Sequence, residues 1–468
     1  MQKLILSLLV GLFAPSVPKP AITSAVAPAA ITVAQMPADT AQDFQKPPVS
    51  GDDARQARTT VRHEQLPGEN GGRLHRFTFA DGTVVEFSDR PRRTRDQAKR
   101  DWVVGYTGTQ RAAAEPDNTF TAAGQASGLS AESIDALRFI SRHEGGFDAI
   151  NTWDRARFSW GFIQFAGGYG FPPALAHFKA KSPELFQSLL ADYGIDVLPG
   201  ASDRPEPVYV DPDSGKVLRG ASAEQAIGDD PLAIALFIRA GRSPEAKQRQ
   251  VEAAIRDYAL PALTGTSRDV RLSDVLRSPQ GLAMLIDRKV HEGNIGRLGW
   301  ALTHAAIIRN VASPADWPKV EGLALDLAIR DADARTQIAE LGDSTISLLQ
   351  RAAAGARNGD ANLVPDGPSL TGARAALEQA LYQVDYRMVV STRRDSVRAS
   401  LSTALTGCTP DRMRVLSAPE VASELDRAAA SVRDAVTGFR FEYAIRDRLS
   451  DIRNSQLPGP AREALDYP

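Results

Sequence analysis

Apolar residues recur at steps of three and four over much of the chain, the spacing of amphipathic helices. Residues 130–310 follow this pattern for most of their length and form the candidate catalytic region. Within them, residues 278–293 predict a core helix that Gly293 stops. The positions of that helix at helical spacing are Leu282, Leu285, Ile286 and Lys289.

Two more apolar stripes lie towards the C-terminus. The first contains Leu377, Leu381, Val384 and Met388, and the second contains Val421, Leu425, Ala428 and Val432. They predict two long helices that pair as a hairpin, with a turn near Cys408 and Pro410. Stripes of this period are usually core, so we expect this region to pack on a neighbour or a protein partner and not to catalyse.

A different pattern precedes the helices. Residues 74–79 and 84–87 alternate in character about Asp81 and Gly82, which predicts a short β-hairpin. Residues 28–72 show no apolar period and predict a disordered leader. Residues 198–220 contain several prolines and predict a loop. The predicted fold is therefore mainly α with a small β-hairpin.

The N-terminal segment and the cysteine content predict where the protein is located. Residues 1–27 resemble a signal peptide, with Lys3, an apolar run over residues 4–13 and the small residues Ala25 to Ala27. The run is shorter than the roughly 20 residues of a spanning helix. We therefore expect a secreted or periplasmic protein with no stable membrane span. The only cysteine, Cys408, cannot form an internal disulfide.

The length of the chain limits the number of domains, and its net charge limits the kinds of ligand. A chain of 468 residues predicts roughly two to three domains. The 55 basic and 57 acidic residues leave a net charge of −2, without the basic footprint of a nucleic-acid-binding protein. The predicted segments are a signal peptide (1–27), the leader (28–72), a hairpin and linker (73–125), a catalytic domain (126–312), a helical extension (313–356) and a C-terminal helical hairpin (369–455).

The most informative segment is residues 141–165, SRHEGGFDAINTWDRARFSWGFIQF. Ser130 is a candidate N-cap, and Glu144 closes the helix that follows, on the same face as its apolar residues. Burial on that face disfavours the charged carboxylate and predicts a raised pKa, as a general acid requires. Gly145 and Gly146 fit the left-handed turn that ends a helix. In the simpler alternative, Glu144 only pairs with Arg138 or Arg142.

A second carboxyl follows in the same segment. Asp154 lies between Trp153 and Arg155, and Arg155 and Arg157 are expected to keep it ionised, as a base that activates water requires. The alternative is an aspartate that only bonds its own backbone in a turn. Ser159 supplies a hydroxyl to help hold the water. The candidate substrate-binding residues are Trp153, Phe165 and Tyr169, through stacking on sugar rings, and Gln164, through hydrogen bonding.

This order of residues resembles the lysozyme-like glycoside hydrolases, which include phage-type lysozymes, lytic transglycosylases and family 46 chitosanases. Phage-type lysozymes have a Glu-Gly at a helix end, an aspartate some nine residues later on a hairpin, and a threonine, where this chain has Ser159. Chitosanases are similar over residues 154–165, and lytic transglycosylases at Glu144 and residues 161–164. The resemblance is strong over about 25 residues and loose over residues 130–310.

The resemblance implies a lysozyme-like α+β catalytic domain followed by an α-helical C-terminal region. It also implies inverting cleavage of β-1,4 bonds in peptidoglycan, with Glu144 as acid and Asp154 as base, their carboxyls about 6.5 to 9.5 Å apart. Three alternatives remain open: a chitosanase, a lytic transglycosylase, and a catalytically inactive envelope protein that binds or scaffolds. No metal or other cofactor is expected, because the histidines His177, His291 and His304 lack zinc-site spacing.

Overall fold

The computed structural model describes residues 48–91, 101–105, 117–153, 155–200, 204–267, 269–359, 367–388 and 393–461. Helices make up 65% and strands 13% of it, which confirms the mainly α prediction. The predicted signal peptide and Asp154 lie outside the described residues. None of the described helices combines the length and the apolar composition needed to cross a bilayer.

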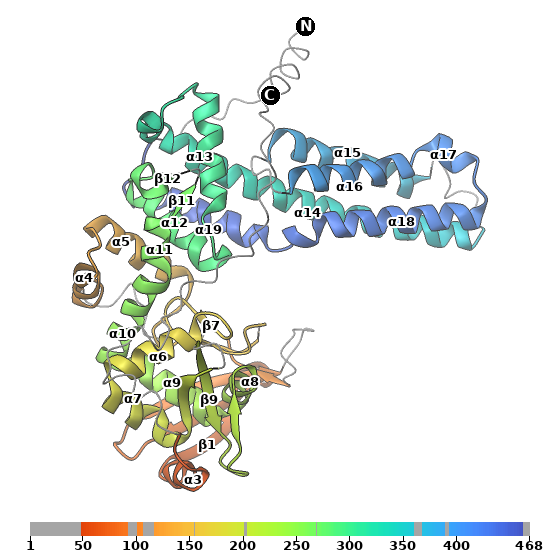
Figure 1. Ribbon diagram of the computed structural model, residues 1–468. Coiled ribbons are helices and arrows are strands. Elements are labelled where there is room, and N and C mark those ends of the chain that lie inside the picture. Colours follow the sequence, from red (N-terminus) through yellow and green to blue (C-terminus); the bar gives the residue numbers. More distant parts are fainter. Residues whose placement is uncertain are drawn as a thin grey trace.

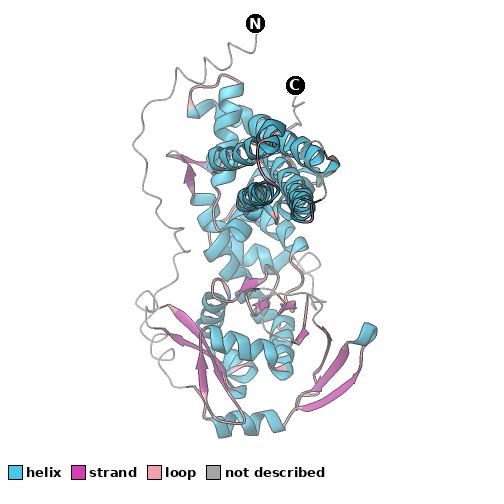
Figure 2. Cartoon of the chain, turned by 90° about the vertical axis from the view of Figure 1, so that its right-hand side faces the viewer, coloured by secondary structure: helices cyan, strands magenta, loops and turns pink. Residues whose placement is uncertain are grey.

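The structure has a body and a long helical bundle that projects from it (Figure 1). The body contains all the strands that the structure describes, whereas the bundle helices are seen almost end-on in Figure 2. The longer helices of the body are α3 (Gly51–Thr59), α4 (Asp117–Ala126), α5 (Ala131–Ile140), α6 (Phe171–Lys181), α7 (Pro183–Leu189), α8 (Ala221–Asp229), α9 (Pro231–Arg242), α10 (Pro244–Ala254), α11 (Leu260–Thr264), α12 (Pro279–Glu292), α13 (Gly296–Ile308) and α19 (Glu442–Asn454).

The predicted hairpin is present within a four-stranded antiparallel sheet. Its strands, in the order β1-β2-β3-β4, are β1 (Arg62–Pro67), β2 (Arg73–Thr78), β3 (Val84–Pro91) and β4 (Trp102–Val103). The turn between β2 and β3 contains Gly82, with φ 82°, and the Thr83 amide donates to Asp81 Oδ1 at 3.0 Å. The Asp81-Gly82 turn is therefore confirmed.

The prediction of a disordered leader is wrong for its last part. Ser50 caps α3, and β1 pairs with β2 along its whole length. Five of the six β1 side chains are exposed, so its order comes from backbone pairing with β2 and not from an apolar face. Such a strand leaves no alternating pattern in the sequence.

The predicted loop at residues 198–220 is also wrong in part. It contributes to a three-stranded antiparallel sheet of β8 (Ile195–Pro199), β9 (Pro205–Val210) and β10 (Val217–Arg219), ordered β10-β9-β8. Pro205 and Pro207 lie where β9 pairs with β8 alone, because β10 pairs only with Val208 to Val210. Prolines are tolerated at such an unpaired edge. Two short strands, β11 (Thr266–Ser267) and β12 (Val270–Arg271), form a separate antiparallel pair in the body.

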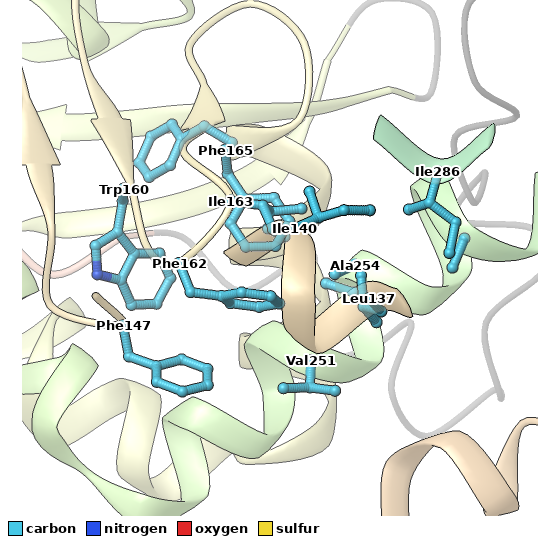
Figure 3. Close-up of a cluster of buried hydrophobic side chains, with 14 of the residues drawn as sticks. Leu137, Ile140, Phe147, Trp160, Phe162, Ile163, Phe165, Val251, Ala254 and Ile286 are labelled. Atoms are coloured by element: carbon cyan, nitrogen blue, oxygen red, sulfur yellow. The ribbon is translucent and has the colours of Figure 1, made fainter. Parts of the chain in front are cut away.

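A small sheet lies directly after α5, and one hydrophobic core joins the two. Its antiparallel strands are β5 (Ile150–Asn151), β6 (Ser159–Trp160) and β7 (Phe165–Ala166), in that order. Side chains from α5, the β6–β7 turn, α10 and α12 meet in the cluster shown in Figure 3. The predicted helix at 278–293 is confirmed as α12, with Ser278 as its N-cap and Gly293 in a left-handed conformation at its end.

The C-terminal region is a four-helix bundle with its own core. Its long helices are α14 (Glu321–Arg357), α15 (Pro368–Tyr386), α16 (Arg394–Gly407) and α18 (Ala418–Val436), and a short α17 (Pro410–Arg414) precedes α18. Both α15 and α18 pack on α14 and on α16. The predicted hairpin of the two apolar stripes is wrong, because α14 and α16 lie between those stripes. Cys408 is buried at the turn after α16.

Helix α19 brings the chain back from the bundle to the body. Leu449 and Ile452 are buried in the body's core, and Arg453 forms an ion pair with Asp326 Oδ1 at 2.8 Å. The bundle is therefore an excursion between α13 and α19. This return places C-terminal side chains next to the segment that follows α5.

Candidate active site around Glu144

The end of α5 holds Glu144 in a fixed position. Ser130 caps the helix, with its Oγ accepting from the Ser133 amide at 3.3 Å, as predicted. A short 3₁₀ turn, Ser141–His143, follows α5, and Glu144 ends it. Gly145 then adopts φ 121°, a conformation open mainly to glycine. Glu144 is 6% exposed, so the predicted burial on the apolar face is confirmed.

The turn after Glu144 is held from two sides. The side chain of Gln250 donates to Phe147 O at 3.0 Å and accepts from the Phe162 amide at 3.2 Å. It thereby ties the turn to the β6–β7 connection. On the other side, Gly241 of α9 packs directly against the backbone of Phe147 and Asp148.

Replacing Gly241 with alanine is expected to lower the free energy of unfolding by about 1–3 kcal/mol. The new Cβ would lie 2.3 Å from Phe147 O and 2.6 Å from Asp148 Cα, and a backbone contact of this kind has no flexible end that can move. Urea unfolding at pH 7 measures the change. A matched control is Gly372→Ala in α15, where the nearest atom, Leu348 Cδ1, is 3.4 Å away. That variant should leave the free energy of unfolding unchanged or raise it by up to about 1 kcal/mol. Equal losses of stability in the two variants would contradict the close packing of Gly241 against the turn.

An imidazole and a guanidinium from distant parts of the chain contact the carboxyl. His291 Nε2 of α12 lies 2.8 Å, and Arg448 Nη1 of α19 lies 2.5 Å, from Glu144 Oε1. Neither donor is aligned well enough with Oε1 for a hydrogen bond, so the Arg448 contact is an ion pair and the His291 contact is a close polar contact. Arg448 Nη2 also lies 2.7 Å from Oδ1 of Asp287, which is buried and paired with Arg288.

These two contacts reverse the predicted direction of the Glu144 pKa shift. Burial alone raises the pKa of Glu144, but the contact with His291 and the positive charge of Arg448 lower it by more, so the net pKa lies below the usual value. The prediction of a raised pKa is therefore wrong. It rests on desolvation and omits His291 and Arg448, which come from helices far away in the sequence.

The second predicted carboxyl cannot be placed, because Asp154 lies outside the described residues. Its separation from Glu144 stays a prediction, as does the role of Arg155. Arg157 adopts φ 64°, unusual for a residue other than glycine, and its Nη1 lies 3.7 Å from Glu224 Oε2. Ser159 is 2% exposed in β6, opposite Asn151 and Ala166.

The predicted substrate-binding residues differ in exposure. Trp153 is 38% and Tyr169 77% exposed, so both rings are accessible to a ligand. Phe165 is fully buried against Phe162, and its assignment as a stacking residue is wrong because its ring belongs to the core. Gln164 has φ 52°, its side-chain Nε2 donates to Gly161 O at 3.0 Å, and its buried Oε1 accepts no hydrogen bond from the residues that the structure describes.

Three residues of the site, His291, Asp287 and Arg448, were not predicted from the sequence. The histidine spacing excludes only a zinc site, and Arg448 falls in the predicted helical hairpin. One signal was available: Asp287 and His291 are four residues apart on a helix whose apolar positions predict burial. Charged groups at that spacing within a core helix indicate buried partners.

The arrangement can hold either a negative charge or a proton on a buried carboxyl next to an imidazole. Within the described ranges, no group of three or more His, Cys, Asp or Glu side chains is placed to hold a metal ion.

None of the family models, curated proteins or solved structures compared with this chain matches it.

Proposed function

We propose that this chain is a lysozyme-like glycoside hydrolase that cleaves the β-1,4 bonds of peptidoglycan, with Glu144 as the general acid. One observation carries the proposal: a buried carboxyl ends a helix and is followed directly by a short three-stranded antiparallel sheet. The same order of helix-end glutamate and hairpin underlies the resemblance to phage-type lysozymes. In sequence, Asp154 lies between β5 and β6, the position of the second carboxyl in that resemblance.

Because the pKa of Glu144 is lowered, the carboxyl needs a source for the proton that a general acid donates. His291 Nε2 lies 2.8 Å from Glu144 Oε1, and catalytic hydrogen bonds that are poorly aligned before substrate binds commonly align in the complex, where a proton can pass from the imidazole to the carboxyl. A glycan bound in the site excludes water and disfavours separated charges there. Glu144 then protonates the departing sugar oxygen, while Asp154 acts as base on water that Ser159 helps to hold.

Gln164 gives separate support for a ligand near this sheet. A residue other than glycine at φ 52° is strained by roughly 1–3 kcal/mol, and such strain tends to occur at functional sites. Its buried Oε1 also has no donor among the described residues. An acetamido N–H or a hydroxyl of a bound sugar would supply that donor.

Product analysis tests the proposal. The purified protein is incubated with peptidoglycan and, separately, with chitosan, and soluble products are analysed by mass. Hydrolysis of peptidoglycan adds one water to each cleaved bond and supports the proposal. Anhydro ends would identify a lytic transglycosylase, products from chitosan alone would identify a chitosanase, and no product from either would leave the inactive envelope protein.

A further inference from the structure

Asp287 is a fully buried carboxylate on α12 that contacts both side chains next to Glu144. Its Oδ1 accepts hydrogen bonds from Arg448 Nε at 2.8 Å and from Arg448 Nη2 at 2.7 Å. The Nε2 atom of His291, one helical turn further along α12, lies 3.6 Å from the same oxygen. The Oδ2 atom of Asp287 accepts from Arg288 Nε at 3.1 Å. Contacts through two different side chains therefore link Asp287 to the site.

The guanidinium of Arg448 is divided between two carboxylates. Its Nε and Nη2 face Asp287, whereas its Nη1 lies 2.5 Å from Glu144 Oε1. A guanidinium is planar and holds its N–H groups in a fixed fork, so the edge that is bonded to Asp287 sets the direction of the remaining nitrogen. The position of Nη1 beside Glu144 therefore depends on Asp287.

Asp287 also acts on the charge of Glu144. Burial and the negative charge of Asp287 raise the pKa of Glu144, while His291 and Arg448 lower it by more. Asp287 itself stays ionised, because burial raises its pKa but Arg288, Arg448 and His291 lower it by more. Without the charge of Asp287, Arg448 would act on Glu144 alone, and the carboxyl would hold a proton less readily.

Two other elements packed against α12 carry titratable groups near this pair. Tyr258 lies on the π-helical segment Ile255–Ala259. Burial, Asp257 and, more weakly, Glu144 raise the pKa of Tyr258 well above its ordinary value, so its hydroxyl stays uncharged at the pH of an assay. On α5, the guanidinium of Arg138 lies over an aromatic ring of the core.

We infer that Asp287 is a positioning residue of the Glu144 site, which holds Arg448 and His291 beside Glu144 and shares the charge of Arg448 with it. The inference rests on the proposed glycoside hydrolase function and deepens it, because it names a group that helps Glu144 to carry the proton it donates. A side chain with no exposed surface acts through its neighbours and not through contact with a substrate.

Asp287→Asn tests the inference through the pH dependence of activity. Asparagine has nearly the same shape and keeps an oxygen that can accept from Arg448, but it has no negative charge. The alkaline limb of the kcat/KM profile, measured per folded molecule on soluble oligomers of N-acetylglucosamine, should therefore move to lower pH. Activity should fall about 3- to 10-fold at pH 7, and the deficit should shrink towards about pH 4, where more of Glu144 is protonated in both proteins.

Arg448→Met should move the same limb in the opposite direction. It removes a charge that lowers the pKa of Glu144, so more of the carboxyl keeps its proton at high pH. Both variants should lose stability, because each leaves a buried charge short of a partner. A purely structural role of Asp287 predicts parallel losses of activity in the two variants and no opposite shifts of the limb.

Asp331→Asn is the matched control. Asp331 is also fully buried and pairs with two arginines, Arg297 at 2.6 Å and Arg335 at 2.8 Å. Its loss of stability should therefore be similar to that of Asp287→Asn. These two arginines are not the side chains that contact Glu144, so the pH profile should match that of wild type.

A second variant covers the case in which Asp287→Asn does not fold. The double variant Asp287→Asn with Arg288→Met removes one buried charge of each sign, a change that is often neutral for stability. It still leaves Arg448 to Glu144 alone, so its limb should also move to lower pH.

The outcomes are distinguishable. The expected result is a limb at lower pH when Asp287 loses its charge, at higher pH in Arg448→Met and unchanged in Asp331→Asn. An unshifted limb without the charge of Asp287, or the same shift in Asp331→Asn, would overturn this inference alone. A wild type that cleaves neither peptidoglycan nor chitosan would overturn the proposed function and this inference with it.

Discussion

Replacing Arg448 with methionine is expected to lower the free energy of unfolding by about 3–5 kcal/mol. Arg448 is the cation shared by two buried carboxylates, Glu144 and Asp287. Methionine fills a similar space but leaves both negative charges short of a partner in a medium that solvates them poorly. Urea unfolding at pH 7, followed by tryptophan fluorescence and circular dichroism, measures the loss.

Arg446→Met is the matched control on the same helix. Arg446 pairs with Asp447, which is largely exposed, and such pairs contribute about 0–1 kcal/mol. A loss of similar size in the two variants would show that α19 responds to any change of charge. It would also show that the contact between Arg448 and Glu144 has no special role in stability.

The pH dependence of the Arg448→Met effect follows from the direction of the pKa shifts. Both Glu144 and Asp287 have pKa values below their ordinary ones in the folded chain, so their stabilising ion pairs are fully present above the unfolded pKa, about 4. That stability is lost as the pH falls through the folded pKa values. The difference between wild type and Arg448→Met should therefore be largest near pH 7 and shrink below pH 4. A difference that stays constant down to pH 3 would contradict the ion-pair account.

Replacing Glu144 with glutamine is expected to lower kcat by about 10²- to 10⁴-fold, with a much smaller change in KM. Glutamine keeps the shape of the side chain but has no proton to give to the departing oxygen. Arg448 keeps Asp287 as a partner, so the variant should fold. Soluble oligomers of N-acetylglucosamine separate kcat from KM, and Glu132→Gln on the exposed N-terminal turn of α5 should retain full activity.

Local features of the structure were predictable from sequence because their causes are local. The cap at Ser130, the Asp81-Gly82 turn and α12 with its Gly293 stop all follow from residues within a few positions of one another, and so does the break near Glu144, although α5 itself ends at Ile140 and a 3₁₀ turn leads to Glu144. Each depends on backbone geometry or helical spacing, which a short window of sequence contains. The burial of Glu144 followed from the same reasoning.

Features that depend on distant partners were missed or wrong. Strand β1 is ordered by β2, and the two predicted stripes pack on α14 and α16 instead of on each other. The pKa of Glu144 is lowered by His291 of α12 and by Arg448, which the return of α19 brings to the site. Phe165 illustrates a third limit, since an aromatic residue beside a site has the same sequence pattern whether its ring faces a ligand or the core.

The most direct test of the account compares wild type and Glu144→Gln on purified peptidoglycan, at equal concentrations of folded protein, by counting new reducing ends over time. The account predicts steady release by wild type and almost none by the variant, with both proteins unfolding cooperatively. Equal release by the two proteins would show that another group breaks the bond. No release by either would remove the glycosidase from consideration.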